Sequence, residues 1–309
     1  MMRRVFLALS GSDSLRRAAS SSGVASKAAG RFVAGETIED AIRAVGALNA
    51  AGLTATLDHL GENVSTLTEA RHARDAYLTA LDTIGRQRVR SGISLKLTAL
   101  GLDLGTDVAA THLEEVVARA ASADRPIFVR IDMEGSAYTQ VTLEVFRAQF
   151  AQTKNVGAVI QSYLYRSDAD IETLCSLGAH VRLVKGAYLE PADIAYPDKA
   201  DVDAAYVRQA TRLLSSEARA NGVEVALATH DENIVRWAVK HTAAQGIDKA
   251  EFEFQMLYGI RRDLQERLAA EGYRVRVYVP YGSQWYPYFM RRLAERPENV
   301  AFILKNLRH

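Results

Sequence analysis

Residues 93–100 read ISLKLTAL, a run in which apolar residues alternate with polar ones that include Lys96. Residues 126–133 read PIFVRIDM and alternate in the same way, with Arg130 and Asp132 at polar positions. A period of two is typical of a strand with two different faces. In a barrel, one face lies under the surrounding helices and the other points inward. We therefore expect these charged residues to point into the interior of a barrel.

Six more runs of this kind occur along the chain. The eight expected strands are TATLDHL (54–60), ISLKLTAL (93–100), PIFVRIDM (126–133), VGAVIQSY (156–163), HVRLVKGA (180–187), VEVALATH (223–230), EFEFQML (251–257) and YRVRVYVP (273–280). Longer segments with apolar residues at helical spacing separate them. This alternation predicts an α/β fold, a (β/α)8 barrel of the TIM type. An open doubly wound sheet is the alternative, but neither G-x-G-x-x-G nor G-x-x-x-x-G-K-[ST] occurs in the chain.

The chain begins with a segment that precedes the expected barrel. Residues 1–32 are rich in Arg, Ser and Ala and contain one acidic residue, a composition also found in mitochondrial transit peptides. They continue without a Pro- or Gly-rich linker into GETIEDAIRAVGALNAAG, whose apolar residues recur at helical spacing. We favour a helical N-terminal arm of the mature protein over residues 1–53. A single barrel domain over 54–309 would follow.

The overall charge excludes several kinds of partner. Lys and Arg total 38 against 37 Asp and Glu, a net charge of +1, so nothing attracts the whole chain to nucleic acid or an anionic bilayer. Cys175 is the single cysteine and cannot form an internal disulfide, which indicates a reducing compartment such as the cytoplasm. No run approaches the roughly 18 apolar residues of a membrane span. We expect a small-molecule ligand, no nucleic acid and no metal.

The same strand register predicts a balanced set of interior charges. The expected set is Lys96, Arg130, Arg182 and Arg276 against Asp132, Glu134, Glu224 and Glu253. Buried charges are stable only when they are paired, so most of this set is interpreted as a structural ion-pair network. Lys96, Asp132 and Gln161 differ because they lie near the C-terminal ends of strands, where TIM barrels place their active sites.

The segment YGSQWYPYFMRRLAERPEN follows the last expected strand. A helix over 283–296 would place Tyr288, Arg291, Arg292 and Glu295 on one stripe. Arginine presents a planar fork that binds a carboxylate through two hydrogen bonds. The stripe therefore favours a clamp for a small carboxylate over the alternative, an exposed face with salt bridges.

Seven segments resemble the bacterial, single-function proline dehydrogenases: ISLKLTALGLDL, RIDMEGS, QSYLYR, RLVKGAYLEP, ATHD, FEFQMLYGIR and YVPYGSQWYPYFMRRLAERPEN. They occur in the family's order from about residue 31 to the C-terminus. The resemblance implies a distorted (β/α)8 barrel with a non-covalent FAD. It further implies that L-proline is oxidised to Δ1-pyrroline-5-carboxylate by hydride transfer, and that a membrane quinone receives the electrons. Such delivery would require at least transient contact with a membrane.

The resemblance also implies which residues bind and convert the substrate. Arg291 and Arg292 would grip the proline carboxylate, with Lys96 as a third cation. The residues expected to enclose the ring and to hold the arginine pair are Leu257, Tyr278, Tyr288 and Glu295. Asp132 and Arg182 would be the catalytic residues, the first beside the substrate and the second near the flavin atoms that become negative on reduction.

A further set of matching positions is expected to bind FAD. It comprises Met133, Gln161, Arg182, Lys185, Gly186, Ala187, Thr229 and His230. Glycine at 186 would allow close backbone approach, and Lys185 could neutralise the pyrophosphate. For His230 we favour a hydrogen bond to the flavin over a satisfied core histidine. A metal ligand is disfavoured because no second histidine stands at ligand spacing.

Two other functions remain open from the sequence. Lys96 and Lys185 at strand ends could form a Schiff base with a carbonyl substrate, as in a barrel aldolase. That reading leaves the arginine stripe without a role unless the substrate is a keto acid. A flavin-binding protein without turnover is the other alternative, and a complete substrate clamp argues against it.

Overall fold

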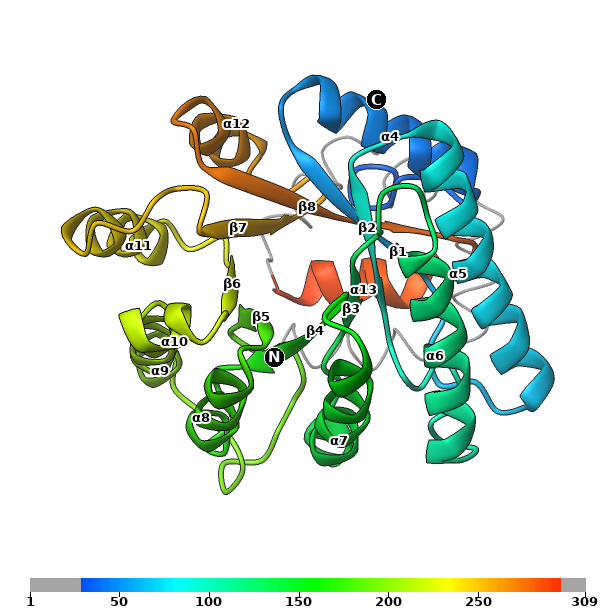
Figure 1. The fold of residues 1–309 in the computed structure, drawn as a ribbon, viewed down its shortest axis with the longest axis horizontal. Helices are drawn as coiled ribbons and strands as arrows, with labels where there is room; N and C mark the ends of the chain where they lie inside the picture. Colours follow the sequence, from blue (N-terminus) through cyan, green and yellow to red (C-terminus); the bar gives the residue numbers. More distant parts are fainter. Residues whose placement is uncertain (1–28, 296–309) are drawn as a thin grey trace.

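The barrel is closed by eight parallel strands in a computed structural model that describes residues 29–295. The strands are β1 (Thr54–His59), β2 (Ser91–Leu95), β3 (Val129–Ile131), β4 (Val156–Gln161), β5 (His180–Val184), β6 (Glu224–Ala228), β7 (Phe252–Leu257) and β8 (Arg274–Tyr281). Each pairs with its neighbours in sequence, and β8 closes the ring by pairing with β1 (Figure 1). The expected (β/α)8 fold of the TIM type is therefore confirmed.

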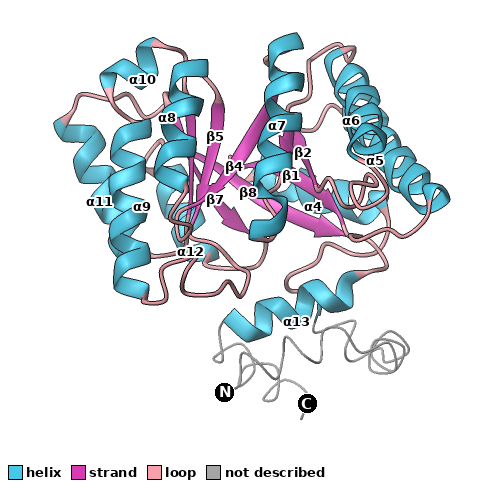
Figure 2. Cartoon of the chain, turned by 90° about the horizontal axis from the view of Figure 1, so that it is seen from below, coloured by secondary structure: helices cyan, strands magenta, loops and turns pink. Residues whose placement is uncertain are grey.

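Helices cover the outside of this ring (Figure 2). They are α4 (Ile38–Ala50), α5 (Leu67–Gln87), α6 (Thr106–Ala121), α7 (Ser136–Gln152), α8 (Ser167–Leu177), α9 (Lys199–Leu213), α10 (Ser216–Ala220), α11 (Glu232–Ala244) and α12 (Arg262–Ala270). The last described helix, α13 (Trp285–Glu295), lies at the mouth of the ring instead (Figure 2). Outward residues of the strands, such as Leu57, Ile93 and Val129, are fully buried under the outer helices. At α4 and α5 a threonine cap and an acid three residues later form capping boxes, which satisfy backbone N–H groups that lack a helical partner.

The strands end earlier than the sequence pattern suggests. Lys96, Asp132, Lys185 and Thr229 each come directly after the last residue of a strand. At Gly186 the backbone φ is +116°, and a Cβ there would lie 2.3 Å from the Tyr163 ring. Glycine lets the chain turn away from the sheet at this point. These expected site residues are thus carried by the first turns of the loops at the C-terminal mouth of the barrel.

Two helices depart from a regular alternation. Helix α4 packs on the outside of β1 and β8, while α13 crosses the barrel mouth (Figures 1 and 2). Helix α13 packs in a second hydrophobic cluster of Ala29, Phe32, Val33, Leu60, Ile260, Trp285, Tyr286, Tyr288, Phe289 and Met290. Gly259 permits this contact, because a Cβ there would lie 1.8 Å from the Arg31 carbonyl oxygen. Residues 1–28 of the expected arm lie outside the described residues, so the boundary at 53/54 remains a prediction.

Only some of the charged residues expected in the barrel interior form ion pairs with one another. Arg276 Nε lies 2.8 Å from Glu253 Oε1, and Arg182 Nη1 lies 2.7 Å from Asp132 Oδ1. The first pair joins the neighbouring strands β7 and β8, while Arg182 on β5 reaches past β4 to Asp132 at the end of β3.

Two members of that set were placed wrongly, and a third lies inside as expected but has a different kind of partner. Glu224 begins β6, and its side chain is 61% exposed at the rim. Glu134 lies three residues beyond the end of β3, where the strand register no longer holds, and its carboxylate accepts from the backbone N–H and the hydroxyl of Thr98. Arg130 is buried but donates to backbone carbonyls instead of a carboxylate. The barrel interior therefore contains positive charge that the expected acids do not neutralise.

Candidate active site

A cavity of about 370 Å³ opens between α13 and the C-terminal ends of the strands. Fourteen of the sixteen expected site residues line it: Lys96, Asp132, Met133, Gln161, Arg182, Lys185, Gly186, Ala187, Thr229, His230, Leu257, Tyr278, Tyr288 and Arg292. The other two, Arg291 and Glu295, belong to α13, but their side chains lie outside the described part of the chain. The structure thus brings the expected residues to one place, while their individual roles remain predictions.

Asp132 is the centre of a hydrogen-bond network at the floor of this cavity. Its Oδ1 accepts from Ser94 Oγ and from Arg182 Nη1, both at 2.7 Å. Its Oδ2 accepts from Tyr278 Oη, also at 2.7 Å. Burial, helped by the nearby Asp132 charge, raises the pKa of Tyr278 far above its usual value, so the phenol stays protonated and donates. Asp132 is therefore fixed by donors from three different strands.

Lys96 lies between two carboxylates, one of which the sequence reading missed. Its Nζ is 3.3 Å from Asp58 Oδ2 and 3.9 Å from Asp132 Oδ2. Burial alone would lower the pKa of Lys96, but the two carboxylates outweigh it and raise that pKa above its usual value. A Schiff-base lysine needs the opposite shift, which argues against the aldolase alternative. Asp58 was detectable, because Thr54, Thr56 and Asp58 alternate with apolar residues in TATLDHL.

Arg182 connects the cavity floor to a second missed residue, Gln255. Its Nε donates to Gln255 Oε1, and its Nη1 also donates to Ser94 Oγ at 3.1 Å. The guanidinium lies over the Tyr278 ring, 5.4 Å from the ring centroid. Gln255 falls on the inward face of EFEFQML, so the strand alternation could have found it as well.

Helix α13 adds an aromatic ring and a cation on the opposite side. The Arg292 guanidinium lies 5.1 Å from the centroid of the Tyr288 ring, within the range of a cation–π contact. Four described cations line the cavity, Lys96, Arg182, Lys185 and Arg292, while Asp58 and Asp132 are the acids among its lining residues. The excess positive charge suits a small ligand that carries a carboxylate.

The cavity wall near β5 and β6 contains a different charge cluster. Lys185 Nζ lies 2.5 Å from Asp203 and 2.8 Å from Asp231, and Lys199 lies 3.1 Å from Asp231. Burial would raise the pKa of Asp231, but its hydrogen bonds with the two lysines hold that pKa well below its usual range. Two carboxylates therefore already neutralise Lys185. A pyrophosphate bound at Lys185 would lie next to this whole cluster of lysines and aspartates.

His230 joins the ends of two strands. Its Nε2 accepts a hydrogen bond of 2.9 Å from the backbone N–H of Leu257. The neutral ring then carries its proton on Nδ1. The part of the chain that the structure describes contains no group of three His, Cys, Asp or Glu side chains placed to bind a metal.

Some polar atoms of the cavity have no hydrogen-bond partner among the described residues, and they are donors and acceptors of the kinds that a flavin ring would bind. Gln161 donates through Nε2 to the Glu134 carbonyl at 2.8 Å, and among the described residues nothing donates to its Oε1. Arg182 uses Nε and Nη1, while its Nη2 has no hydrogen-bond partner within residues 29–295. An isoalloxazine ring presents both N–H donors and carbonyl or ring-nitrogen acceptors. One open acceptor and one open cationic donor on this wall therefore fit a flavin.

None of the helices described between residues 29 and 295 is long and apolar enough to cross a lipid bilayer.

Comparison with known proteins extends over nearly the whole chain. A family model described as proline dehydrogenase matches residues 41–305. The chain is 44% identical over 307 residues to proline dehydrogenase 1 of Bacillus subtilis subsp. natto, with 99% of both chains covered. It is 45% identical over 282 residues to a proline dehydrogenase of Deinococcus radiodurans, which covers 90% of this chain and 89% of the relative.

A solved structure shares the fold. Proline utilization A (PutA) from Bdellovibrio bacteriovorus, inactivated by N-propargylglycine, superposes with a TM-score of 0.81 at 27% sequence identity. The match covers 88% of this chain but 33% of the PutA chain, so it concerns one part of a longer protein. Together with the matches along the full length of the bacterial relatives, it leaves one assignment. The chain belongs to the proline dehydrogenase family of oxidoreductases.

Proposed function

We propose that this chain oxidises L-proline to Δ1-pyrroline-5-carboxylate with FAD as its cofactor and a membrane quinone as the electron acceptor. The observation that carries the proposal is the charge arrangement of the large cavity. Of the four cations that line it, Lys185 pairs with Asp203 and Asp231, and the other three, Lys96, Arg182 and Arg292, face two carboxylates beneath a helix that carries an aromatic ring. The family membership supports the same substrate.

The substrate carboxylate would bind near α13. Arg292 offers a guanidinium that is held against Tyr288, and Lys96 adds a second positive charge from β2. The attraction of Asp58 and Asp132 keeps Lys96 charged. Arg291 and Glu295, on the same helix, remain the expected partners of this clamp. Tyr278, Tyr288 and Leu257 would then enclose the pyrrolidine ring.

The reaction removes a hydride from C5 of proline and a proton from its nitrogen, which leaves a C=N bond. FAD, when bound, supplies the hydride acceptor. Positive charge develops at the substrate nitrogen, so the cations belong at the substrate carboxylate and near the acceptor. We propose that Arg182 is the cation on the acceptor side. Asp132, which accepts from Arg182 and Tyr278, would act by keeping both in position.

A separate set of residues would hold the cofactor. Gln161 presents an open acceptor, and the loop from Lys185 to Ala187 turns away from the sheet at Gly186. Thr229 and His230 follow β6, and Met133 follows Asp132 on the loop after β3. The Lys185 ammonium would meet the pyrophosphate, with Asp203 and Asp231 fixing its place.

The decisive experiment is anaerobic mixing of the FAD-loaded protein with L-proline. We expect the flavin absorbance to fall, and to recover when a soluble short-chain quinone is added. Pyrrolidine is the matched control, because it has the same ring and amine but no carboxylate for Arg292 and Lys96. We expect at least a tenfold lower rate constant with pyrrolidine, the loss of one charge-assisted hydrogen bond. If L-proline leaves the flavin oxidised, the protein is a flavin-binding protein without this activity and the proposal fails.

A further inference from the structure

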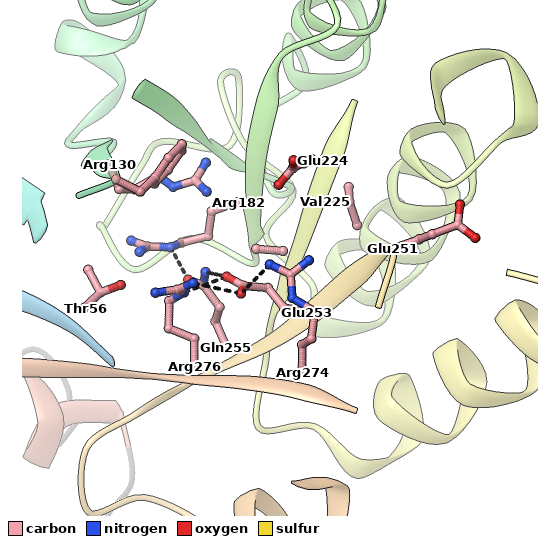
Figure 3. A pocket seen from close by; sticks show the side chains of 12 residues that line it. Thr56, Arg130, Arg182, Glu224, Val225, Glu251, Glu253, Gln255, Arg274 and Arg276 are labelled. Atoms are coloured by element: carbon pink, nitrogen blue, oxygen red, sulfur yellow. Dashed lines mark hydrogen bonds and ion pairs between the residues drawn. The ribbon is translucent and has the colours of Figure 1, made fainter. Parts of the chain in front are cut away.

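A second cavity, of about 180 Å³, lies at the opposite end of the barrel, where the strands begin. Its walls combine arginine and glutamate side chains from β3, β5, β6, β7 and β8 and the segment before β7 (Figure 3). The charged residues that line it are Arg130, Arg182, Glu224, Glu251, Glu253, Arg274 and Arg276. None of these residues except Arg182 lines the active-site cavity.

Two of the three acids of this cavity pair with arginines, and the third is mostly exposed. Glu253 accepts from Arg276 at 2.8 Å and lies 3.5 Å from Arg274. Glu251 pairs with Arg219 at 2.6 Å. Glu224 is 61% exposed and faces His180 Nδ1 at 3.7 Å. Figure 3 shows the ion pairs gathered around Glu253, with Arg130 standing apart on the opposite wall.

Arg130 is the cation that none of these acids neutralises. The residue is 6% exposed, and its Nη1 donates to the carbonyl oxygens of Ala158 at 3.0 Å and His180 at 2.7 Å. Within residues 29–295, neither Nε nor Nη2 donates to any group. Burial, together with the repulsion of Arg182 and Arg276, lowers the pKa of Arg130 to about 9, so it is still cationic at neutral pH.

The position of this guanidinium is built into the sheet. A Cβ at Gly157 on β4 would lie 2.4 Å from Arg130 Nη1 and 2.8 Å from the His180 carbonyl oxygen. Any other residue at 157 would push the guanidinium away from the two carbonyls. On another side, Arg130 Cζ lies 4.8 Å from the centroid of the Phe128 ring. Glycine, carbonyls and ring together fix Nη1, while Nη2 and the buried Nε have no hydrogen-bond partner among the described residues.

We propose that this cavity binds one small oxyanion, such as inorganic phosphate or a short-chain carboxylate, through Nε and Nη2 of Arg130. That edge is the one with which arginine grips carboxylate and phosphate oxygens in pairs. A volume of about 180 Å³ has room for such an anion and a few waters, since a water occupies roughly 30 Å³ of liquid. The anion supplies the negative charge that the buried guanidinium lacks.

Arg182 and Gln255 line both cavities and so form the wall between them. Gln255 accepts from Arg182 and donates to Glu253, which pairs with Arg276. An anion bound at Arg130 would therefore lie one layer of side chains from the active-site floor. The binding proposal itself does not depend on the reaction at the other end.

The test is equilibrium dialysis of the full-length protein against radiolabelled phosphate at constant ionic strength. We expect one phosphate per chain and at least a tenfold weaker affinity in Arg130→Met. Arg292→Met, which removes a cation from the other cavity, and Arg119→Met, on the surface, should bind phosphate as the wild type does. Displacement by acetate would assign a carboxylate ligand, and resistance to acetate would assign phosphate; both support the oxyanion site. No stoichiometric binding, or equal affinity in Arg130→Met, overturns the proposal.

A second measurement covers the case in which Arg130→Met does not fold. Crystals of the wild-type protein soaked in selenate report the anion directly through its anomalous signal. A peak within hydrogen-bond distance of Arg130 Nε supports the site. An ordered water at that place, with no peak, overturns it.

Discussion

The two ends of the barrel are each organised around a carboxylate, but the two carboxylates are in different electrostatic situations. At the C-terminal end, Asp132 accepts from Ser94, Arg182 and Tyr278. At the other end, Glu253 accepts from Gln255 and from two nitrogens of Arg276. Both acids are nearly enclosed, with side chains 12% and 9% exposed. The two carboxylates accept similar hydrogen bonds. They differ in the charged groups that surround them.

The pKa shifts separate the two ends. Burial would raise the pKa of Glu253, but Arg276 outweighs it and lowers that pKa to about 2. At the other end, burial raises the pKa of Asp58 even though Lys96 opposes the shift. The attraction of Arg276 therefore outweighs burial at Glu253, whereas the attraction of Lys96 does not outweigh burial at Asp58. A saturated ion pair such as Glu253–Arg276 indicates a structural role, and a charged group without such a partner beside a cavity indicates a binding role.

The largest effect is expected from Glu253→Gln. The substitution keeps the size of the side chain but leaves the half-buried Arg276 without its counter-charge. Removing one partner of a buried pair costs about 3–5 kcal/mol. We expect the free energy of unfolding, measured by urea titration, to fall by about that amount.

Asp132→Asn makes the same chemical change at the active-site end and is the matched control. Lys96 retains Asp58 there, and the adjoining cavity lets water reach Arg182. We expect a smaller loss of stability than in Glu253→Gln, together with a larger loss of proline oxidation. Equal losses of stability in the two variants would show that the ends do not differ in the way the charges indicate.

Acid titration gives the next largest effect. Glu253 has a folded-state pKa of about 2 against a usual value of 4.5, so its contribution of about 3 kcal/mol is complete above pH 4.5 and is lost as the pH falls toward 2. Asp58 has a raised pKa and takes up its proton first. Carbon-13 NMR of labelled side-chain carboxyls should show Asp58 titrating above its usual 3.8 while Glu253 is still ionised.

The same linkage predicts how stability changes with pH. The difference in unfolding free energy between the wild type and Glu253→Gln should shrink as the pH falls from 4.5 toward 2, because protonation removes the charge that the variant lacks. A difference that stays constant over this range would mean that Glu253 does not hold its charge in the folded state.

Arg292→Met tests the binding end and is expected to have a moderate effect. It removes the guanidinium that lies over Tyr288 and leaves an apolar chain in the same space. A charge-assisted hydrogen bond contributes about 1.5–3 kcal/mol, so KM for L-proline should rise about tenfold to a hundredfold. The flavin content, measured by absorbance after denaturation, should not change. Loss of flavin in this variant would place Arg292 with the cofactor instead.

Strand alternation predicted the barrel and much of the cavity from the sequence, because a period of two fixes which residues point inward. Strand alternation no longer predicts the direction of a side chain beyond the end of its strand. Glu134 was placed inside the barrel by a register that stops at Ile131, and its carboxylate lies at Thr98. Asp58 and Gln255 were visible in the alternation, but pairing between distant strands decides that they contact Lys96 and Arg182. No local pattern contains that information.

The position of the last helix shows the same limit. Its stripe of Tyr288 and Arg292 could be read from helical spacing, but its place across the barrel mouth depends on contacts from far away in the chain. Gly259 admits the Arg31 backbone, and Trp285 donates to Glu36 at 3.2 Å. Helix α4 lies beside β1 and β8. Neither arrangement follows from periodicity, because periodicity reports which face of an element is buried and not what buries it.

The smallest effect is expected from Arg119→Met, which sets the baseline for the comparison. Arg119 Nη1 lies 3.0 Å from Asp82 Oδ1, almost the same distance as the 2.8 Å between Arg276 and Glu253, but both surface side chains are 50% exposed. Water solvates such a pair nearly as well when it is apart, so exposed pairs contribute about 0.2–1 kcal/mol. A double-mutant cycle with Asp82→Asn should measure a coupling in that range, falling further at high salt. A coupling of about 3 kcal/mol here would mean that distance sets the strength of these pairs, and the contrast between the two ends of the barrel could then not rest on burial.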